Sequence, residues 1–243
     1  MLRADGLTIT AGAKTLCAGL SAIFAPGECW ALLGPNGCGK TTLLHTLSGL
    51  RNPASGTVLV NDAPIQSLAR AAQARHVGVL LQEEAAAFWG SVRDYVMLGR
   101  FPHGQSQADH DRVADSIMKV GLDRLVTRSM RTLSGGERQR ARIAQLLAQS
   151  PDVYCLDEPL LHLDLRHQIE MMELFRRLAG EQKKTILMVL HDSLWAGRYC
   201  DSALLLFEGG RVVMGAAPEV LRRDNLEALY GCSLEPFRLL AVS

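Results

Sequence analysis

The stretch GPNGCGKT, residues 34–41, limits the possible folds of this chain more than any other feature. It fits G-x-x-x-x-G-K-[ST] and lies between an apolar strand pattern, CWALL, and a helical pattern, TTLLHTLSGL. Glycines let backbone amides converge on phosphate oxygens, the lysine reaches the terminal phosphates, and the threonine hydroxyl can bind Mg²⁺. We therefore predict a nucleotide site formed by Gly34, Pro35, Asn36, Gly37, Cys38, Gly39, Lys40, Thr41 and Thr42.

Short apolar runs alternate with helical periodicity along the chain, which predicts an α/β fold with a phosphate-loop NTPase core. The strand patterns are GLTIT, ECWALLG, GTVLV, HVGVLL, VYCLD, TILMVL, ALLLFEGG and RVVMG. This alternation implies a mainly parallel sheet covered on both faces, and we expect an antiparallel β edge beside it. Residues 91–149 contain only helical patterns, so we expect a single domain with a core of residues 1–90 and 150–243 and an inserted helical lobe.

Polar residues stand at the ends of three predicted strands. Asp157 and Glu158 end VYCLDE, His191 follows TILMVL, and Gln82 follows HVGVLL. Ligands of open α/β sheets bind at the carboxyl ends of the strands. There Asp157 would support Mg²⁺, and Glu158 would orient or deprotonate an attacking water. A lone histidine at such a position is more often structural, and Gln82 is equally ambiguous by itself.

A second candidate anion site lies far downstream, in RTLSGGERQR, residues 131–140. Ser134 and two glycines precede a strongly polar run, which is typical of a helix start. Backbone N–H groups at a helix N-terminus carry partial positive charge and suit an anion. The sequence therefore holds two candidate phosphate sites in one chain.

Composition argues against several kinds of partner. The formal net charge of +1 gives no electrostatic reason to expect nucleic acid or an anionic membrane surface. The sequence has no apolar run of membrane-spanning length and no signal peptide, so we expect a soluble cytosolic chain. The six cysteines lack metal-binding spacing and are expected to be ordinary thiols in a reducing compartment. Cys38 is the exception, because its phosphate-loop setting predicts a reactive thiolate.

In their order along the chain, GPNGCGKTT, Gln82, LSGGE, LDEP, Asp164 and His191 resemble the motifs of an ATP-binding-cassette ATPase. The resemblance covers essentially the whole chain. It implies that Lys40 and Thr41 hold the phosphates and Mg²⁺ of ATP. It further implies that Gln82 senses the γ-phosphate and contacts metal or water, and that Asp157 supports Mg²⁺. Glu158 would be the catalytic carboxylate, and His191 would contact the γ-phosphate.

The same resemblance explains the second anion site. Ser134, Gly135 and Gly136 would bind the γ-phosphate of ATP held by a second copy of the chain. Two chains would stack head to tail and enclose two ATP molecules, with Asp164 among the nucleotide-binding residues. Neither half-site would then be complete in one chain.

The resemblance also implies partners. Because the chain has one cassette and no membrane span, the resemblance implies separate membrane permease subunits and a substrate-binding protein. It also implies that the chain works at the cytoplasmic face of the cell membrane. LGRFPH, residues 98–103, and the LHLDL after LDEP resemble importers of iron–siderophore, haem and vitamin B12 chelates. A helix end stopped by Pro102 explains LGRFPH equally well. Phe88 and Trp89 suit either a docking surface for the membrane partner or the core of the lobe.

Other functions fit fewer of these motifs. A cassette protein acting on DNA or ribosomes would carry a long coiled coil or two cassettes in one chain, and neither pattern is present. A nucleotide kinase or GTPase leaves LSGGERQR and His191 unexplained. The alternative among transporters is an exporter with separate membrane subunits. We therefore expect an ATPase that powers the import of a metal chelate.

One departure from the family pattern concerns the nucleotide base. Family members often stack an aromatic residue of the first strands on adenine, and Ala11 stands at the corresponding place in LTITAGAKTL. Arg3 and Lys14 are candidates to place a cation over the base instead. We expect loose selectivity for the base.

Overall fold

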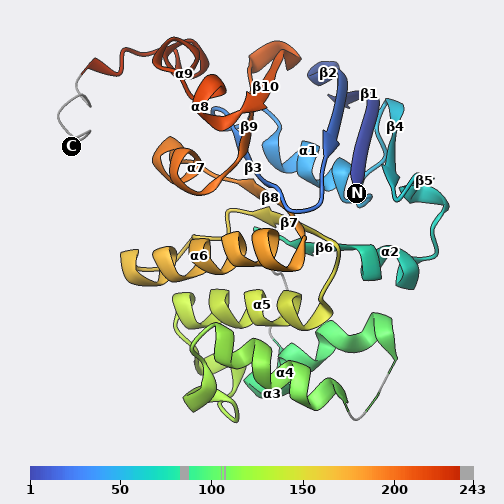
Figure 1. Cartoon of the computed structure of the whole chain (residues 1–243), viewed down its shortest axis with the longest axis vertical. Coiled ribbons are helices and arrows are strands. Elements are labelled where there is room, and N and C mark those ends of the chain that lie inside the picture. Colours follow the sequence, from blue (N-terminus) through green and yellow to red (C-terminus); the bar gives the residue numbers. More distant parts are fainter. Residues whose placement is uncertain (83–87, 105, 107, 236–243) are drawn as a thin grey trace.

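The computed structural model describes residues 1–82, 88–104, 106 and 108–235. Two sheets and a group of helices form the molecule (Figure 1). The strands are β1 (Leu2–Ala11), β2 (Lys14–Phe24), β3 (Cys29–Leu33), β4 (Ser55–Val60), β5 (Ala63–Pro64), β6 (Val77–Leu80), β7 (Val153–Asp157), β8 (Thr185–Val189), β9 (Ser202–Leu206) and β10 (Val212–Ala216). The α-helices are α1 (Lys40–Leu47), α2 (Arg70–His76), α3 (Val92–Met97), α4 (Ala108–Lys119), α5 (Gly135–Gln149), α6 (Leu165–Gln182), α7 (Ser193–Tyr199), α8 (Ala217–Val220) and α9 (Arg223–Tyr230). Short 3-10 segments are η1 (Ile65–Ser67), η2 (Leu98–His103), η3 (Asp123–Leu125), η4 (Met130–Thr132) and η5 (Glu208–Gly210).

The larger sheet has the strand order β10-β9-β3-β8-β7-β6 within the described residues. All pairs from β9 to β6 are parallel, and β10 joins the edge antiparallel to β9. Every residue of β3, β7 and β8 is buried, because these strands are covered on both faces. This explains why CWALL, VYCLD and TILMV are nearly continuous apolar runs in the sequence.

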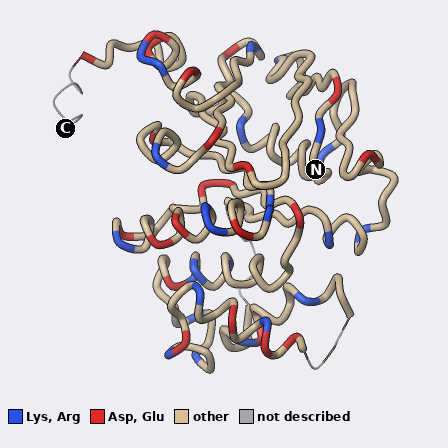
Figure 2. The backbone as a smooth tube through the Cα atoms, in the orientation of Figure 1, with Lys and Arg blue, Asp and Glu red and all other residues tan. Residues whose placement is uncertain are grey.

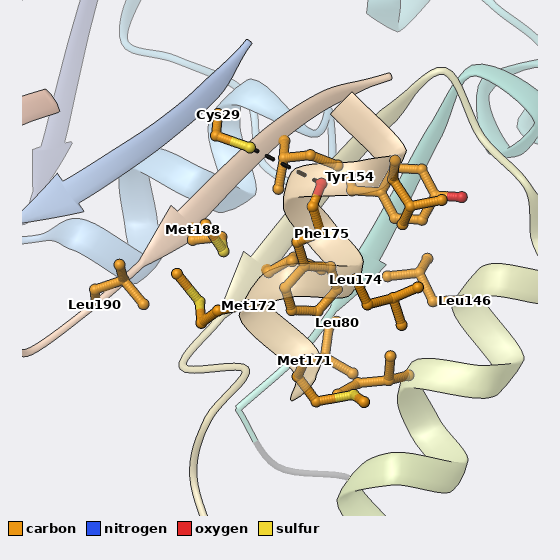
Figure 3. Close-up of a cluster of buried hydrophobic side chains, with 14 of the residues drawn as sticks. Cys29, Leu80, Leu146, Tyr154, Met171, Met172, Leu174, Phe175, Met188 and Leu190 are labelled. Carbon is orange, nitrogen blue, oxygen red and sulfur yellow. Dashed lines mark hydrogen bonds between the residues drawn. The ribbon is translucent and has the colours of Figure 1, made fainter. Parts of the chain in front are cut away.

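Side chains that alternate along the central strands feed two separate apolar layers. One layer contains Ala31, Tyr154 and Met188 and packs against α5 and α6; Figure 3 shows part of it around Phe175, whose carbonyl oxygen lies 3.9 Å from Cys29 Sγ. The other layer contains Leu32, Cys155 and Leu187 and packs against α1 and the smaller sheet. The central strands therefore have helices or a second sheet on each side.

The smaller sheet is antiparallel, in the order β2-β1-β4-β5. It confirms the expected antiparallel β edge and, with the parallel sheet, the α/β fold class. The sequence analysis did not predict β2. Its alternation of apolar and polar residues is interrupted, since the adjacent Leu16 and Cys17 are both buried and its pairing with β1 has shifts in register.

Residues between β6 and β7 contribute α3, η2, α4, η3, η4 and α5, which lie together at the bottom of Figure 1. A buried ion pair joins them: Arg100 Nε lies 2.8 Å from Asp109 Oδ1, and Arg100 Nη1 donates to the Ala148 carbonyl at 2.7 Å. Pro102 does not stop a helix, because α3 already ends at Met97 and Pro102 lies inside η2. In LGRFPH, Arg100 is therefore a buried connection between η2, α4 and α5.

Phe88 and Trp89 have different environments. Phe88 packs against the core, with its ring centroid 5.4 Å from that of Tyr95. Trp89 is 78% exposed, and the Arg131 guanidinium lies over its ring at 4.1 Å from the centroid. Phe88 therefore belongs to the core, whereas Trp89 lies on the surface, where docking of a membrane partner stays a prediction.

Charged residues of both signs are interspersed along the described backbone (Figure 2). Among the described residues, no helix combines the length and the apolar character that crossing a membrane requires.

Candidate functional site

The phosphate loop connects β3 to α1, as the sequence predicts. Lys40 is buried, and its ammonium donates to the carbonyl oxygens of Gly34 at 2.8 Å and Pro35 at 3.0 Å. Gly39 caps α1 with a φ of 113°, and a Cβ there would lie 2.9 Å from Leu16 Cβ of β2. Only glycine combines this backbone conformation with so close an approach of another strand.

Asp157 ends β7 with its side chain fully buried. Burial raises the pKa of this carboxyl, while the nearby Thr41 hydroxyl and Lys40 act to lower it. Neither carboxylate oxygen has a partner at hydrogen-bond geometry among the described residues. Two buried, unpaired oxygens beside a hydroxyl fit a small hard cation, so Asp157 and Thr41 suit the predicted Mg²⁺ site.

Glu158 and His191 form a close pair at the ends of β7 and β8. His191 Nε2 lies 2.7 Å from Glu158 Oε1; the Glu158 side chain is 14% exposed and the His191 side chain 52%. Glu158 has a φ of 50°, a left-handed conformation that is costly for a residue with a Cβ. The ends of β7 and β8 therefore place a carboxylate and an imidazole in direct contact.

Strand order brings the predicted residues to one edge of the sheet. β3, β8, β7 and β6 are consecutive parallel neighbours, so their carboxyl ends lie side by side. These ends lead to the phosphate loop, His191, the pair Asp157 and Glu158, and Gln82, in that order. We call this set the strand-end site. Gln82 is exposed, and its backbone carbonyl lies 3.5 Å from Arg142 Nη1 of α5.

Ser134 lies apart from the strand-end site, as the N-cap of α5. Its hydroxyl accepts from the Glu137 amide at 3.2 Å, and its own amide donates to Glu137 Oε2 at 2.8 Å. This reciprocal pair is a capping box. The Ser134 backbone N–H lowers the pKa of Glu137, so that carboxylate is ionised at neutral pH. We call Ser134, Gly135 and Gly136 the Ser134 terminus.

A surface cavity lies against the Ser134 terminus. A Cβ on Gly136 would lie 2.9 Å from the His162 carbonyl oxygen, so only glycine fits closely against the loop after β7. Asp164, the N-cap of α6, accepts from the His167 amide at 2.9 Å and pairs with His167 Nδ1 at 2.8 Å. The cavity is lined by Ser134, Gly135, Gly136, Glu137, Arg140, His162, Leu163, Asp164 and His167. Asp164 thus belongs with the Ser134 terminus.

The prediction of a reactive thiolate at Cys38 is wrong. Cys38 is 1% exposed and packs with the apolar layer under the loop. Burial raises the pKa of this thiol, and the nearby Lys40 only partly opposes that effect. The Cys38 amide donates to the Pro35 carbonyl at 3.3 Å within the loop, and the Cys38 side chain is buried in the apolar layer. The other cysteines are free as well, and Cys232 is the exposed one.

Ala11 lies at the end of β1, opposite Lys14 across the hairpin, and both are exposed. Leu16, two residues beyond Lys14, contacts the phosphate loop at Gly39, so this hairpin borders the nucleotide site. Arg3 lies at the other end of β1 and pairs with Asp5 at 3.2 Å and Asp62 at 3.5 Å. Of the two cations considered for the base, Lys14 has the better position.

Two buried polar residues of α5, Gln139 and Arg142, were missed in the sequence. Gln139 Nε2 donates to the Pro159 carbonyl at 3.1 Å, and Arg142 donates to the carbonyl of Leu81. In the sequence, the burial of these two side chains is indicated only by their position on a helix face that is otherwise apolar. Their partners are far away in the sequence, so periodicity does not show them.

The fold and the strand-end site define a phosphate-loop ATPase with a parallel sheet. Residues 17–161 match the sequence pattern of the ABC transporter family, and the chain belongs to that family. ATP-binding proteins of this family are ATPases that power transport, so this chain binds ATP and its hydrolysis is coupled to transport.

Several relatives have informative names. The chain is 39% identical to the ferric enterobactin transport ATP-binding protein FepC of Escherichia coli, covering 95% of this chain and 87% of FepC. It is also 39% identical to the hemin import ATP-binding protein HmuV of Bordetella avium, covering 95% and 92%. Among solved structures, cbiO1 of Clostridium perfringens, part of the transporter complex cbiONQ, has a TM-score of 0.80 at 27% identity, covering 99% of this chain and 98% of cbiO1.

Proposed function

We propose that this chain powers a membrane importer of a metal chelate, such as an iron–siderophore complex, haem or cobalamin. The observation that carries the ATPase part is the meeting of the phosphate loop, Asp157, Glu158, His191 and Gln82 at one sheet edge. The import part is supported by the names of the relatives, which include ferric enterobactin, hemin and cobalamin ATP-binding proteins.

The strand-end residues have separate roles in the proposed reaction. Lys40, Thr41 and the loop amides hold the phosphates. Glu158 takes a proton from the attacking water, and His191, 2.7 Å from Glu158 Oε1, fixes the carboxylate and contacts the γ-phosphate. Thr41, Asp157 and Gln82 would hold Mg²⁺, which offsets phosphate charge when bound.

The Ser134 terminus completes the site of a second copy. Ser134, Gly135 and Gly136 present the N-terminal amides of α5 to the γ-phosphate of the partner's ATP, with Asp164 at the same cavity. Two chains then enclose two ATP molecules, head to tail. ATP favours the closed dimer and its hydrolysis favours separation, which is the cycle a two-state motor needs.

The remaining assignments follow from this role. We propose that residues 1–243 form one ABC ATPase domain, with the helices of residues 91–149 as its inserted lobe. The chain would bind separate permease subunits at the cytoplasmic face of the cell membrane, together with a substrate-binding protein. Exposed Trp89 comes just before the lobe and exposed Phe101 lies on it, and apolar side chains there suit contact with a permease segment.

The test is to express the chain with candidate permease subunits encoded beside it and to isolate the complex in lipid vesicles. ATP hydrolysis should rise when a loaded binding protein delivers a ferric siderophore, haem or cobalamin. Under import, the cargo should accumulate on the side of the membrane where the nucleotide sites lie. Export of the same cargo, or hydrolysis that no cargo of this class stimulates, would overturn the import assignment. If the chain hydrolyses ATP but binds none of the permease subunits, only its assignment as an ATPase is supported.

A further inference from the structure

The face of α5 that is directed towards the sheet buries two polar side chains. Gln139 is 4% exposed and Arg142 is 8% exposed, and they lie one helical turn apart. Burying an arginine is costly unless its N–H groups donate hydrogen bonds, so the acceptors around Arg142 indicate why an arginine stands at this position.

The Arg142 guanidinium contacts the segment after β6. Nη2 donates to the Leu81 carbonyl, and Nη1 lies 3.5 Å from the Gln82 carbonyl oxygen. Nη1 also donates to Gln139 Oε1 at 3.0 Å. One planar group therefore joins the backbone at Gln82 to the next polar side chain on the same helix.

Gln139 continues the connection to the segment after β7. Its Nε2 donates to the Pro159 carbonyl at 3.1 Å and lies 3.5 Å from the Glu158 carbonyl oxygen. The amide orientation is consistent throughout, because Oε1 accepts from arginine while Nε2 faces carbonyl oxygens. The backbones of Gln82 and Glu158, at the ends of two strands, are thus both held by one helix.

We propose that Arg142, acting with Gln139, is a positioning residue that sets Gln82 relative to Glu158. The inference rests on the proposed roles of Gln82 and Glu158 in hydrolysis. The same helix begins at Ser134, so a displacement of α5 on contact with the partner's ATP would be transmitted through Arg142 and Gln139 to both backbones. Occupation of the second copy's site is in this way linked to the geometry of this chain's own site.

Arginine is suited to this task in a way that lysine is not. The guanidinium presents several N–H donors in a fixed plane, and here they reach Leu81, Gln82 and Gln139 at once. An ammonium on a flexible stem concentrates its donors on one atom. Arg142→Lys should therefore restore only part of the function lost in Arg142→Met.

The test measures steady-state ATP hydrolysis by the full chain in its complex, together with ATP affinity. Arg142→Met should lower kcat about 10- to 100-fold, since a misplacement of about 1 Å can cost 100-fold. The KM for ATP should change little, because the phosphate loop is untouched. Gln139→Leu should give a similar loss. The double variant should be no worse than the worse single variant, because both break one connection.

The matched control is the double variant Arg100→Met/Asp109→Leu, which removes a buried arginine near the other end of α5 together with its carboxylate partner. It should change Tm without lowering kcat. If Arg142→Met does not fold, Gln139→Leu and Arg142→Lys provide the same comparison.

Three results would overturn the proposal: unchanged kcat in the folded variants, additive losses in the double variant, or an equal loss of kcat in the control. Glu158→Gln, measured in parallel, separates the two levels of inference. If Glu158→Gln abolishes turnover while Arg142→Met does not lower it, the positioning role fails and the proposed function stands. If Glu158→Gln keeps near-normal turnover, the proposed role of Glu158 in hydrolysis fails, and the positioning role fails with it.

Discussion

The strand-end site and the Ser134 terminus both use a helix N-terminus, but the two are built differently. At α1 the N-cap is Gly39, without a side-chain cap, and the buried Lys40 stands at the first position. At α5 the N-cap is Ser134, which is exposed and already bonded to Glu137. The N-terminus of α1 thus has a cation of its own chain, Lys40, beside it, whereas the N-terminus of α5 is bonded to a carboxylate of its own chain, Glu137.

This difference bears on the proposal that one chain carries two phosphate sites that do not compete. The ionised Glu137 partly offsets the positive end of α5, so free phosphate or ATP alone gains little there. A phosphate delivered on a partner's ATP gains from all the contacts of that partner. The Ser134 terminus is therefore suited to sensing a second copy rather than to holding nucleotide by itself.

The largest expected effect is at the strand-end site. Glu158→Gln should lower ATP turnover by about 10²–10⁴, because the amide cannot take the proton from water while its size is preserved. ATP binding should persist, and ATP should now hold the dimer together. Turnover assays and size-exclusion chromatography with ATP measure both effects. Glu219→Gln, an exposed change, is the control, and near-normal turnover of Glu158→Gln would remove that residue from its role.

A change at the Ser134 terminus should separate binding from turnover. Ser134→Arg should lower turnover by about 10²–10³, the range for losing a donor to transition-state charge, yet leave ATP binding to the same chain intact. Mixing it with Lys40→Ala chains should restore one intact composite site per dimer. Ser91→Arg, which removes the corresponding capping box from α3, is the control for helix stability.

Two outcomes of that mixing experiment are informative. Rescue above the residual rates supports a site shared between chains. If no rescue occurs, ATP-dependent crosslinking of Ser134→Cys to the partner's phosphate loop distinguishes a need for two intact sites from a wrong assignment. Absence of both rescue and crosslinking would contradict the comparison between the two sites.

A smaller effect is expected at the base. An aromatic face contributes about 1–3 kcal/mol by stacking in nucleic-acid systems, so Ala11→Tyr should tighten ATP binding by about 5- to 150-fold. Turnover should barely change, because stacking is equal in the ground and transition states. In the parent chain GTP should support hydrolysis nearly as well as ATP. Titration of a fluorescent nucleotide against Ala11→Tyr and the parent chain measures the change in affinity. Equal affinities would mean either that Ala11 does not correspond to the stacking position or that another side chain already covers the base.

The smallest effect is expected at Cys38. Because burial raises the pKa of its thiol, a thiol reagent at neutral pH should modify exposed Cys232 first and leave hydrolysis unchanged. Mass spectrometry of the labelled chain, with Cys232→Ser as the control, measures the order of modification. Cys38→Ala should stay active. Rapid labelling of Cys38 with loss of activity would show that the loop opens readily.

Much of the strand-end site could be predicted from the sequence because its parts are local. A glycine-rich loop between an apolar strand and a helix needs only neighbouring residues, and so does the acidic pair Asp157 and Glu158 after VYCL. The parallel-sheet rule then places the ends of separate strands together. The helix cap at Ser134 is equally predictable from the sequence, because Ser134 and its partner Glu137 are only three residues apart.

What the tertiary structure decided depends on residues that are distant in the sequence. Leu16 of β2 lies against Gly39, His191 pairs with Glu158, and Arg142 holds the backbone at Gln82. The burial of Cys38, which reversed its predicted reactivity, is of the same kind. Periodicity and motifs report the neighbours of a residue along the chain, whereas burial, pKa and long-range hydrogen bonds are set by packing between elements, so only the folded chain determines them.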